Sequence, residues 1–170
     1  WGVLMPHTAE DYAPTVGPIQ SAADLETYTP PDPHNESHYA GVRETVRRFK
    51  GEKFIIWHSR AEFMGAAELR GMSNFLMDLA VRPELAHGVL KVVNDCNCAM
   101  ARRAIEAGAD GVMLGDDWAF NAGPFMSPDQ FREFILPLFE NMIRTCKDAG
   151  GYVIKHCDGN VWPLMDMVAD

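Results

Sequence analysis

The chain has 170 residues, a net charge of −9 and an isoelectric point near 5.0. A nucleic-acid-binding protein holds phosphates with clustered Lys and Arg, so this acidic balance excludes that class of protein. Hydrophobic residues make up 47% and charged residues 23% of the sequence, which is typical of a soluble globular domain with one sizeable core.

The sequence also bears on the cellular compartment. Its apolar runs are all shorter than the roughly 18–20 residues that cross a bilayer, and the first residues lack the basic and then apolar layout of a signal peptide. Four cysteines are too few for a secreted disulfide scaffold of this length. We therefore expect a cytoplasmic protein without a membrane partner.

The first 35 residues are rich in loops. "WGVLMP" (1–6) predicts one short strand, and "YTPPDPHN" (28–35) predicts an extended connector because of its prolines. The pattern then changes, and residues 36–50 predict a helix that ends at Gly51.

A first strand and two helices follow. "KFIIWHS" (53–59) is a short apolar run rich in β-forming residues, residues 64–80 predict a helix, and a longer helix covers residues 83–107. Gly108 ends this longer helix. Its apolar stripe has helical spacing and consists of Leu85, Val89, Val93, Cys96 and Met100.

The second strand is "DGVMLGDD" (110–117). Ser127 then forms the N-cap of a helix, with Gln130 where a capping box needs Glu or Gln. Pro137 lies inside this helix and should kink it. The apolar stripe of the helix comprises Phe131, Phe134, Ile135, Leu138, Met142 and Cys146.

The third strand lies in "YVIKHCDGN" (152–160), and one more helix begins near Val161. Apolar strands that alternate with helices indicate parallel β/α units, with strands buried on both faces of the sheet. We expect one domain over residues 1–170, with the loop-rich part at 1–35 and the β/α units at 36–170. In such folds functional residues gather at the carboxyl ends of the strands.

Each of the three strands becomes polar at its carboxyl end. Neighbouring parallel strands lie about 5 Å apart, so we expect His58, Asp116 and His156 to face one common hollow. His58 and Arg60 share one side of their strand, and Arg60 is a natural clamp for a substrate carboxylate. Either residue taken alone could equally be structural.

A metal site is one interpretation of the third strand end. His156 and Asp158 lie two residues apart and share a face, whereas Cys157 points away. This spacing favours a His-x-Asp pair over a His-Cys pair, with further ligands from Asp116, Asp117 or a residue outside this chain. In the structural alternative, His156 forms a hydrogen bond beneath a loop and Asp158 caps the next helix.

The pair Asp116-Asp117 follows the second strand directly. One carboxylate should point into the hollow while the other accepts hydrogen bonds from backbone N–H groups of the loop. Two carboxylates so close together raise the pKa of one of them, which suits proton transfer. The alternative is that both carboxylates only cap the loop.

These residues carry a resemblance to a known family. The stretch "EAGADGVMLGDDWAFNAGPFMSPDQF" and its continuation through "YVIKHCDGNVWPLMDMVAD" resemble the uroporphyrinogen decarboxylase family, as do "WGV", "TPPDP" and "LRGMSNFLMDLAVRPEL". The resemblance is most specific over residues 107–170 and is closest to the branch that includes corrinoid-dependent methyltransferases. It implies a (β/α)8 TIM barrel with the active site at the strand ends. Such a barrel needs at least about 200 residues, so we expect the polypeptide to be longer at both ends.

Two branches of the family imply different chemistry. Decarboxylases carry a Phe-Asp-Ser-Trp type sequence where this chain has "LGDDW" (114–118), and bind the tetrapyrrole without a metal, using arginines and an aspartate in an N-terminal region that this sequence lacks. Thiol-activating methyltransferases bind zinc through His-x-Cys on the strand that corresponds to "KHCDGN". Here His156 matches, but Asp158 stands at the cysteine position and Cys157 is one place out of register. This departure from the family motif argues against thiol-type zinc chemistry and leaves open that His156 and Asp158 bind zinc or another divalent ion.

Three functions follow from these observations. The first is methyl transfer on a small-molecule substrate, with a corrinoid carried by a partner protein. The second is decarboxylation of uroporphyrinogen, a tetrapyrrole, without a cofactor and with Arg60, Arg70 and Lys155 as clamps for its carboxylates. The third is a non-catalytic domain that binds a corrinoid or porphyrin. The residues expected to be catalytic are Asp116, Asp117, His58 and Lys155, and those expected to bind substrate are Arg60, Trp118 and Asn160.

Overall fold

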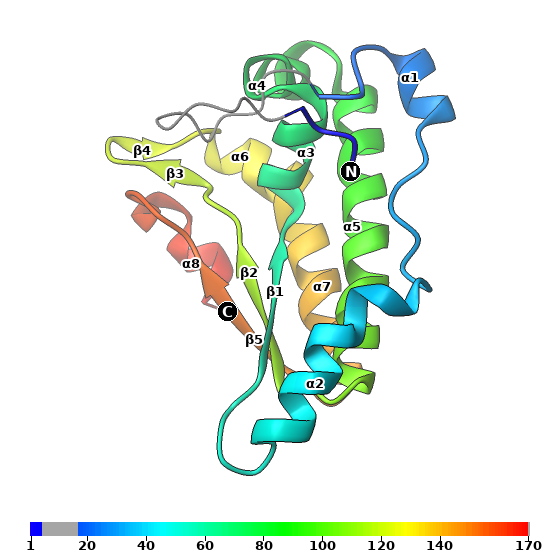
Figure 1. Ribbon diagram of the computed structural model, residues 1–170. Helices are drawn as coiled ribbons and strands as arrows, with labels where there is room; N and C mark the ends of the chain where they lie inside the picture. The colour runs from blue at the N-terminus through cyan, green and yellow to red at the C-terminus, as the bar shows by residue number, and fades with distance from the viewer. Residues whose placement is uncertain (5–16, 170) are drawn as a thin grey trace.

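The structure, a computed structural model, describes residues 1–4 and 17–169. Helical segments separate the three longest strands along the chain (Figure 1). In chain order the elements are α1 (Ala22–Thr27), the 3-10 helix η1 (Glu36–Tyr39), α2 (Ala40–Phe49), β1 (Ile56–Arg60), α3 (Glu62–Arg70), α4 (Met72–Val81), α5 (Pro83–Glu106), β2 (Gly111–Gly115), β3 (Ala119–Phe120), β4 (Gly123–Pro124), α6 (Pro128–Gln130), the π-helical turn η2 (Phe131–Ile135), α7 (Leu136–Asp148), β5 (Tyr152–His156), the 3-10 helix η3 (Trp162–Leu164) and α8 (Met165–Val168).

Three strands form a parallel sheet in the order β1-β2-β5. The last paired row across this sheet consists of Arg60, Gly115 and His156. The three predicted strands are therefore confirmed, and their carboxyl ends lie side by side at one edge of the sheet. This edge is where the sequence analysis expects the functional residues.

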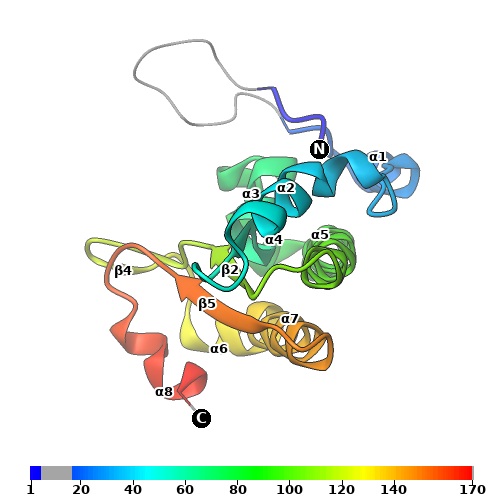
Figure 2. The same ribbon diagram turned by 60° about the horizontal axis from the view of Figure 1, so that its bottom comes forward.

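Helices cover one face of this sheet. α5 packs on β1 and β2, α7 packs on β5, and α3 packs on α5 (Figures 1 and 2). On the other face Ile56, Tyr152 and Ile154 are 43%, 68% and 40% exposed. The expectation that the strands are buried on both faces is therefore wrong for the described residues. Side chains alternate between a core face and an open face, because successive residues of a strand point to opposite sides.

The long helix α5 follows its sequence pattern closely. All five residues of the predicted apolar stripe are buried, from Leu85 to Met100. With 24 residues, the helix extends for about 36 Å. It ends where Gly108 adopts a φ of 108°, as predicted. α5 thus forms the continuous support behind the core face of the sheet.

Two other helices differ from expectation in detail. The helix expected at residues 64–80 is two helices, α3 and α4, because Gly71 between them has a φ of 84° that interrupts the helical backbone. Ser127 and Gln130 form the predicted capping box. The π-helical turn η2 ends two residues before Pro137, which lacks the N–H that a regular α-helical ladder needs.

The sequence pattern does not predict α1 or the hairpin β3–β4. The hairpin is fixed against the loop after β5, because Asn160 donates its N–H to the Phe120 carbonyl at 2.9 Å. Gly159 approaches so closely that an added Cβ would lie 2.7 Å from the carbonyl group of Ala119. Of the strand expected at residues 1–6, residues 5 and 6 lie outside the described residues, and Leu4 forms an isolated bridge.

The helices also bear on membrane insertion. Within residues 1–4 and 17–169, none of them combines the length and the hydrophobicity that crossing a bilayer requires.

Candidate active site

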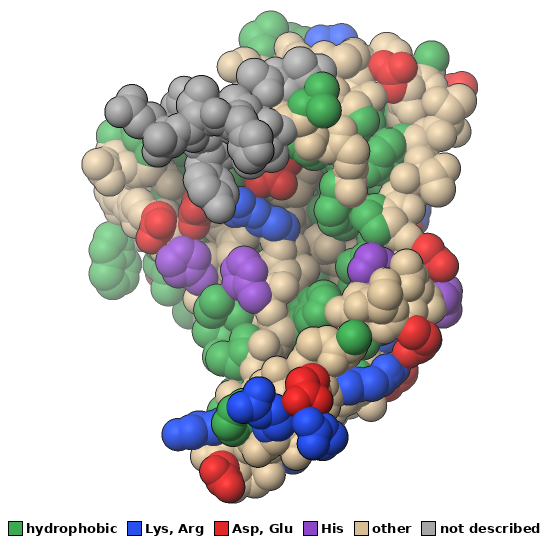
Figure 3. Space-filling view, viewed as in Figure 1, with side chains coloured by type: hydrophobic (Ala, Val, Ile, Leu, Met, Phe, Trp, Pro, Cys, Tyr) green, Lys and Arg blue, Asp and Glu red, His purple; other side chains and the backbone are tan. Residues whose placement is uncertain are grey.

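The carboxyl ends of β2 and β5 bring together one histidine and two aspartates. His156 Nε2 lies 3.8 Å from Asp117 Oδ1 and 3.6 Å from Asp158 Oδ1. The candidate ligand atoms of all three residues lie within 4.8 Å of one another. The side chains of Asp117, His156 and Asp158 are 31%, 52% and 79% exposed, so this cluster is accessible. Figure 3 shows histidine and acidic side chains lying close together on the surface.

Backbone contacts fix the cluster. Asp117 Oδ1 accepts the N–H of Asp158 at 2.9 Å, which joins the loop after β2 to the loop after β5. Cys157 faces elsewhere, since its Sγ accepts the N–H of Trp118 at 3.2 Å. The arrangement agrees with the predicted alternation, in which His156 and Asp158 share a face and Cys157 does not.

The donor set fits a small divalent cation. Ligands about 2.0–2.1 Å from a tetrahedral zinc lie roughly 3.3 Å from one another, and the two His–Asp separations are only slightly longer. One imidazole nitrogen and two carboxylate oxygens suit zinc or a harder divalent ion. Three protein ligands would leave a fourth position for substrate or water.

Asp116 lies behind the cluster and is fully buried. Its carboxylate accepts the N–H of Met64 at 2.7 Å, the N–H of Phe63 at 3.2 Å and the indole N–H of Trp118 at 2.7 Å. The two backbone bonds cap the N-terminus of α3. Burial raises the pKa of Asp116, while its hydrogen bonds and the ammonium group of Lys155 oppose that shift.

Both adjacent aspartates hold backbone N–H groups, as the capping alternative predicts: Asp116 accepts those of α3 and Asp117 accepts that of Asp158. Asp117 also reaches the open cluster. The expectation that Asp116 faces a hollow together with His58 and His156 is wrong, because its side chain is sealed in the core behind the strand end. A direct catalytic role for Asp116 is not supported by this placement.

Lys155 also lies on the core side. Its Nζ donates hydrogen bonds to the backbone carbonyls of Asp116 and His156 and stands 3.9 Å from the centre of the Trp118 ring. Burial lowers the pKa of Lys155. This geometry makes the amine a support for the ends of β2 and β5, and it does not favour the direct catalytic role that the sequence predicts.

Glu62 is a buried acid that the sequence analysis does not single out. It is 0% exposed, its Oε1 accepts an N–H of Asn94 at 2.7 Å, and its Oε2 has no hydrogen-bond partner among the described residues. Burial, and then the charge of Asp116, raise the pKa of Glu62 to about 7. An acid at the first position of a helix that directly follows a strand end is the sequence signal that could have identified it.

His58 lies on the open face of the sheet. Its ring lies over Gly115, where an added Cβ would be 2.7 Å from His58 Nε2. Gly115 pairs with His156 across the sheet, so the two histidines flank the end of β2 on the same face. The structure thus places His58 and His156 on the same face, and both the shared hollow and the catalytic role of His58 stay predictions.

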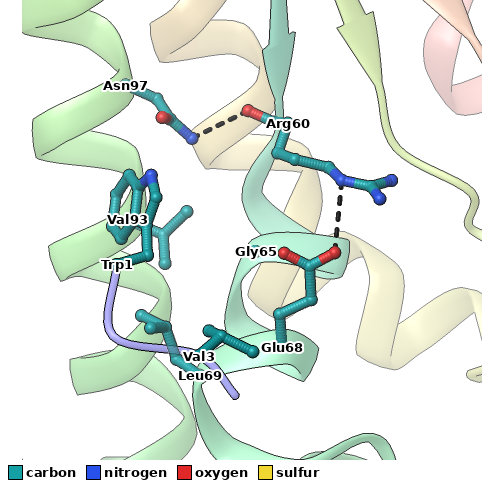
Figure 4. A pocket seen from close by; sticks show the side chains of 8 residues that line it. All are labelled: Trp1, Val3, Arg60, Gly65, Glu68, Leu69, Val93 and Asn97. Atoms are coloured by element: carbon teal, nitrogen blue, oxygen red, sulfur yellow. Dashed lines mark hydrogen bonds and ion pairs between the residues drawn. The ribbon is translucent and has the colours of Figure 1, made fainter. Parts of the chain in front are cut away.

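Arg60 is engaged at a separate small pocket. Its Nε lies 3.2 Å from Glu68 Oε1, and its carbonyl accepts an N–H of Asn97 at 2.8 Å. Figure 4 shows these two contacts beside a small cavity of about 30 Å³ that Trp1 and Val3 also line. The charge of Arg60 is thus partnered, and its role as a substrate clamp stays a prediction.

The last two predicted substrate-binding residues differ in their surroundings. Trp118 is 1% exposed and packs edge-on against Phe131 and Phe139, with ring centroids 4.9 and 5.1 Å away. This burial does not support contact with a substrate. Asn160 Oδ1 is buried and has no hydrogen-bond partner among the described residues, so the role of Asn160 stays a prediction.

Comparisons with known proteins place the chain in a family. The family model for uroporphyrinogen decarboxylase (URO-D) matches residues 5–170. The chain is 29% identical over 140 residues to uroporphyrinogen decarboxylase of Chlorobaculum tepidum, covering 78% of this chain and 39% of that protein. It is 30% identical over 156 residues to uroporphyrinogen decarboxylase of Alkalilimnicola ehrlichii, covering 87% of this chain and 40% of that protein.

A solved structure shares the fold. A methyltransferase from Methanosarcina mazei aligns with a TM-score of 0.67 at 22% identity, over 76% of this chain and 37% of that chain. The chain spans about two fifths of the length of the curated relatives that it matches. Because the family model matches nearly all of its residues, the chain belongs to the uroporphyrinogen decarboxylase family.

Proposed function

We propose that this chain is part of an enzyme that transfers a methyl group with a corrinoid protein, assisted by a divalent metal ion. The observation that carries the proposal is the convergence of Asp117, His156 and Asp158 at the strand ends, with ligand atoms within 4.8 Å of one another. Zinc or another divalent ion bound there would supply a Lewis acid for the substrate atom that gives or receives the methyl group.

The residues around this cluster have distinct tasks in the proposal. His58 lies on the same open face as His156, across β2, and its imidazole is the group that we assign to proton transfer. Asp116 and Lys155 hold the two strand ends from behind. The ligand-facing groups are thus carried by a rigid backbone, which is what a site needs in order to orient a substrate.

We also propose that the sheet is part of a (β/α)8 barrel. Parallel strands with helices on one face, and an open face with the apolar side chains Ile56 and Ile154, support this proposal. In such a barrel the open face would line the interior, and the Asp117–His156–Asp158 cluster would lie at the active end.

Metal titration of the intact protein tests the proposal. We expect Co²⁺ to bind the wild type with the visible absorption of a tetrahedral site, and we expect His156→Ala and Asp158→Ala each to weaken binding at least tenfold, or about 1.4 kcal/mol. His34→Ala is the matched control, because His34 is an exposed histidine in the connector before η1. Equal affinity in wild type and His156→Ala would end the metal proposal.

Decarboxylation of a tetrapyrrole is the second candidate function. The names of the curated relatives favour it. Incubating the intact protein with uroporphyrinogen and measuring coproporphyrinogen tests this activity. A parallel incubation with methylcobalamin and a panel of thiols and alcohols tests methyl transfer. The transfer is measured as the loss of absorption from the cobalt–carbon bond. Product in the first assay and none in the second would replace the leading proposal with this one.

A further inference from the structure

Two carboxyl groups and one ammonium group lie together behind the strand ends. Glu62 and Asp116 are both 0% exposed, and Lys155 donates hydrogen bonds to the backbone carbonyls of Asp116 and His156. With all three groups ionised, this region would carry one more negative than positive charge. An unbalanced charge is costly in a protein interior, so one of the two carboxyl groups should hold a proton.

The hydrogen bonds indicate which acid holds the proton. Asp116 accepts two backbone N–H groups of α3 and the indole N–H of Trp118, at 2.7–3.2 Å, and these donors stabilise its ionised form. Glu62 accepts an N–H of Asn94 at 2.7 Å, but its Oε2 has no hydrogen-bond donor among the described residues. Asp116 thus uses the N–H groups with which the start of a helix stabilises an anion, and Glu62 is the acid that lacks such donors.

A chain of amide groups holds the Glu62 carboxyl in this position. Asn94, the donor to its Oε1, also donates to the Leu138 carbonyl at 3.1 Å and accepts an N–H of Asn141 at 2.8 Å. These bonds join α3 to α5 and α7. Turning the carboxyl group toward water would break that chain, so an ionised Glu62 would stay buried.

Other titratable groups on the neighbouring helices do not supply a balancing charge. Cys98 on α5 and Cys146 on α7 interact electrostatically with Glu62, and burial raises the pKa of each thiol to about 11, so both are neutral near pH 7. Burial and the charge of Asp116 raise the pKa of Glu62 to about 7, against the opposing effects of its own N–H, Asn94 and Lys155. Glu62 therefore changes its charge close to neutral pH.

We propose that Glu62 is a proton-binding site that makes the first turn of α3 respond to pH near neutrality. With the proton bound, Glu62 and Asp116 coexist behind one helix end, and without it two buried anions repel each other there. That turn carries Met64, which lines a surface hollow together with Asp117 of the candidate metal site. The inference goes beyond the proposed function and requires neither a bound metal nor a substrate.

Carboxyl NMR of the intact, chelator-treated protein tests the proton site. The side-chain carboxyl carbons of glutamate are labelled with ¹³C, and we expect a signal that titrates near pH 7, above the ordinary value of 4.5, and that is absent from Glu62→Gln. Glutamine keeps the carbonyl oxygen for Asn94 and stays neutral, so this variant should fold. Glu84→Gln is the matched control, because Glu84 is an exposed acid in the first turn of α5. It should leave the signal in place.

The pH dependence of stability gives a second measurement. A carboxyl group whose pKa is higher in the folded than in the unfolded chain stabilises the fold while protonated, and this contribution is lost as the pH rises. Between about pH 4.5 and 7, the folding equilibrium constant of the wild type should therefore fall by up to tenfold per pH unit relative to Glu62→Gln. Urea unfolding at several pH values measures this ratio, and a ratio that does not change with pH would overturn the proton site.

The methyl group of Met64 reports whether the helix end responds. Its ¹³C signal should shift with a midpoint near pH 7 in the wild type and lose that shift in Glu62→Gln, while Met77, which is 58% exposed on α4, stays unchanged. A Met64 shift that persists in Glu62→Gln would come from another group and would overturn the pH response. A wild type in which no glutamate titrates near pH 7 would overturn the proton site, even if Glu62→Gln failed to fold.

Discussion

Adjacent residues of β5 face opposite sides of the sheet, and the candidate site uses both sides. His156 joins Asp117 and Asp158 in the open cluster, whereas Lys155 reaches behind the strand ends to the carbonyls of Asp116 and His156. The amine is therefore positioned to fix the backbone that carries two of the three cluster residues. This gives Lys155 a testable role as a positioning residue.

Lys155→Met tests that role. The change removes the donor from two backbone carbonyls while it keeps a long side chain against Trp118, so we expect a loss of about 1–3 kcal/mol in the free energy of unfolding. We also expect Co²⁺ affinity to fall several-fold and the visible spectrum of the bound ion to change, measured under conditions where circular dichroism shows a folded protein. Lys155→Arg keeps a cationic donor and should restore part of both. An unchanged affinity and spectrum in folded Lys155→Met would assign the amine to stability alone.

The sequence predicts part of the candidate site and misses the rest for a physical reason. The pairing of His156 with Asp158, and the arrival of Asp117 beside them, follow from strand alternation and from parallel order. The burial of Trp118 does not, because it depends on how the chain turns after the last paired residue of β2. Strand periodicity ends at that point, so it predicts no direction for the residues that follow.

Among the helices and strands, too, the sequence predicts those with a periodic apolar pattern and misses features that lack one. The three strands and α5 are predicted well, because each carries a sustained apolar pattern. The break at Gly71 is missed, because apolar residues continue on both sides of it and hide the change of direction between α3 and α4. The hairpin β3–β4 has two-residue strands, which are too short for an alternating pattern to show.

A matched pair of glycine substitutions tests the break between α3 and α4. A Cβ at Gly71 would have room, with Asn74 Nδ2 at 3.7 Å, but its φ of 84° is unfavourable for alanine. Gly41 lies within α2, and a Cβ there would meet nothing within 4 Å. We expect Gly71→Ala to lower the free energy of unfolding by about 1 kcal/mol or more and Gly41→Ala to raise it by about 0.4–1 kcal/mol. Urea unfolding measures both, and a stabilising Gly71→Ala would show that this backbone conformation is not required.

At the scale of the whole molecule, the open face of the sheet exposes apolar side chains that no described helix covers. Ile56, Tyr152 and Ile154 form an apolar group there, opposite the face that the helices cover. The chain matches relatives of which it spans about two fifths. The barrel proposed above accounts for this surface, because it would turn the open face toward an enclosed interior.

Ile154→Lys in the intact protein tests that account. A lysine enclosed in a barrel interior without a partner should lower the free energy of unfolding by roughly 2–4 kcal/mol. Val81→Lys is the control, because Val81 is 60% exposed on α4 and its change should stay within about 0.5 kcal/mol. If chemical denaturation gives the same small effect for both variants, the face is exposed to water in the intact protein and the barrel proposal fails.

Lys155 and His156 point to opposite sides of the sheet, so the chemistry of β5 depends on the register in which β5 pairs with β2. If β5 slid by a single residue along β2, every side chain would exchange sides. The imidazole would enter the hydrophobic interior and the amine would emerge among the carboxylates. Insertion or deletion of one residue within Tyr152–His156 would therefore abolish the cluster even if the strand itself still formed.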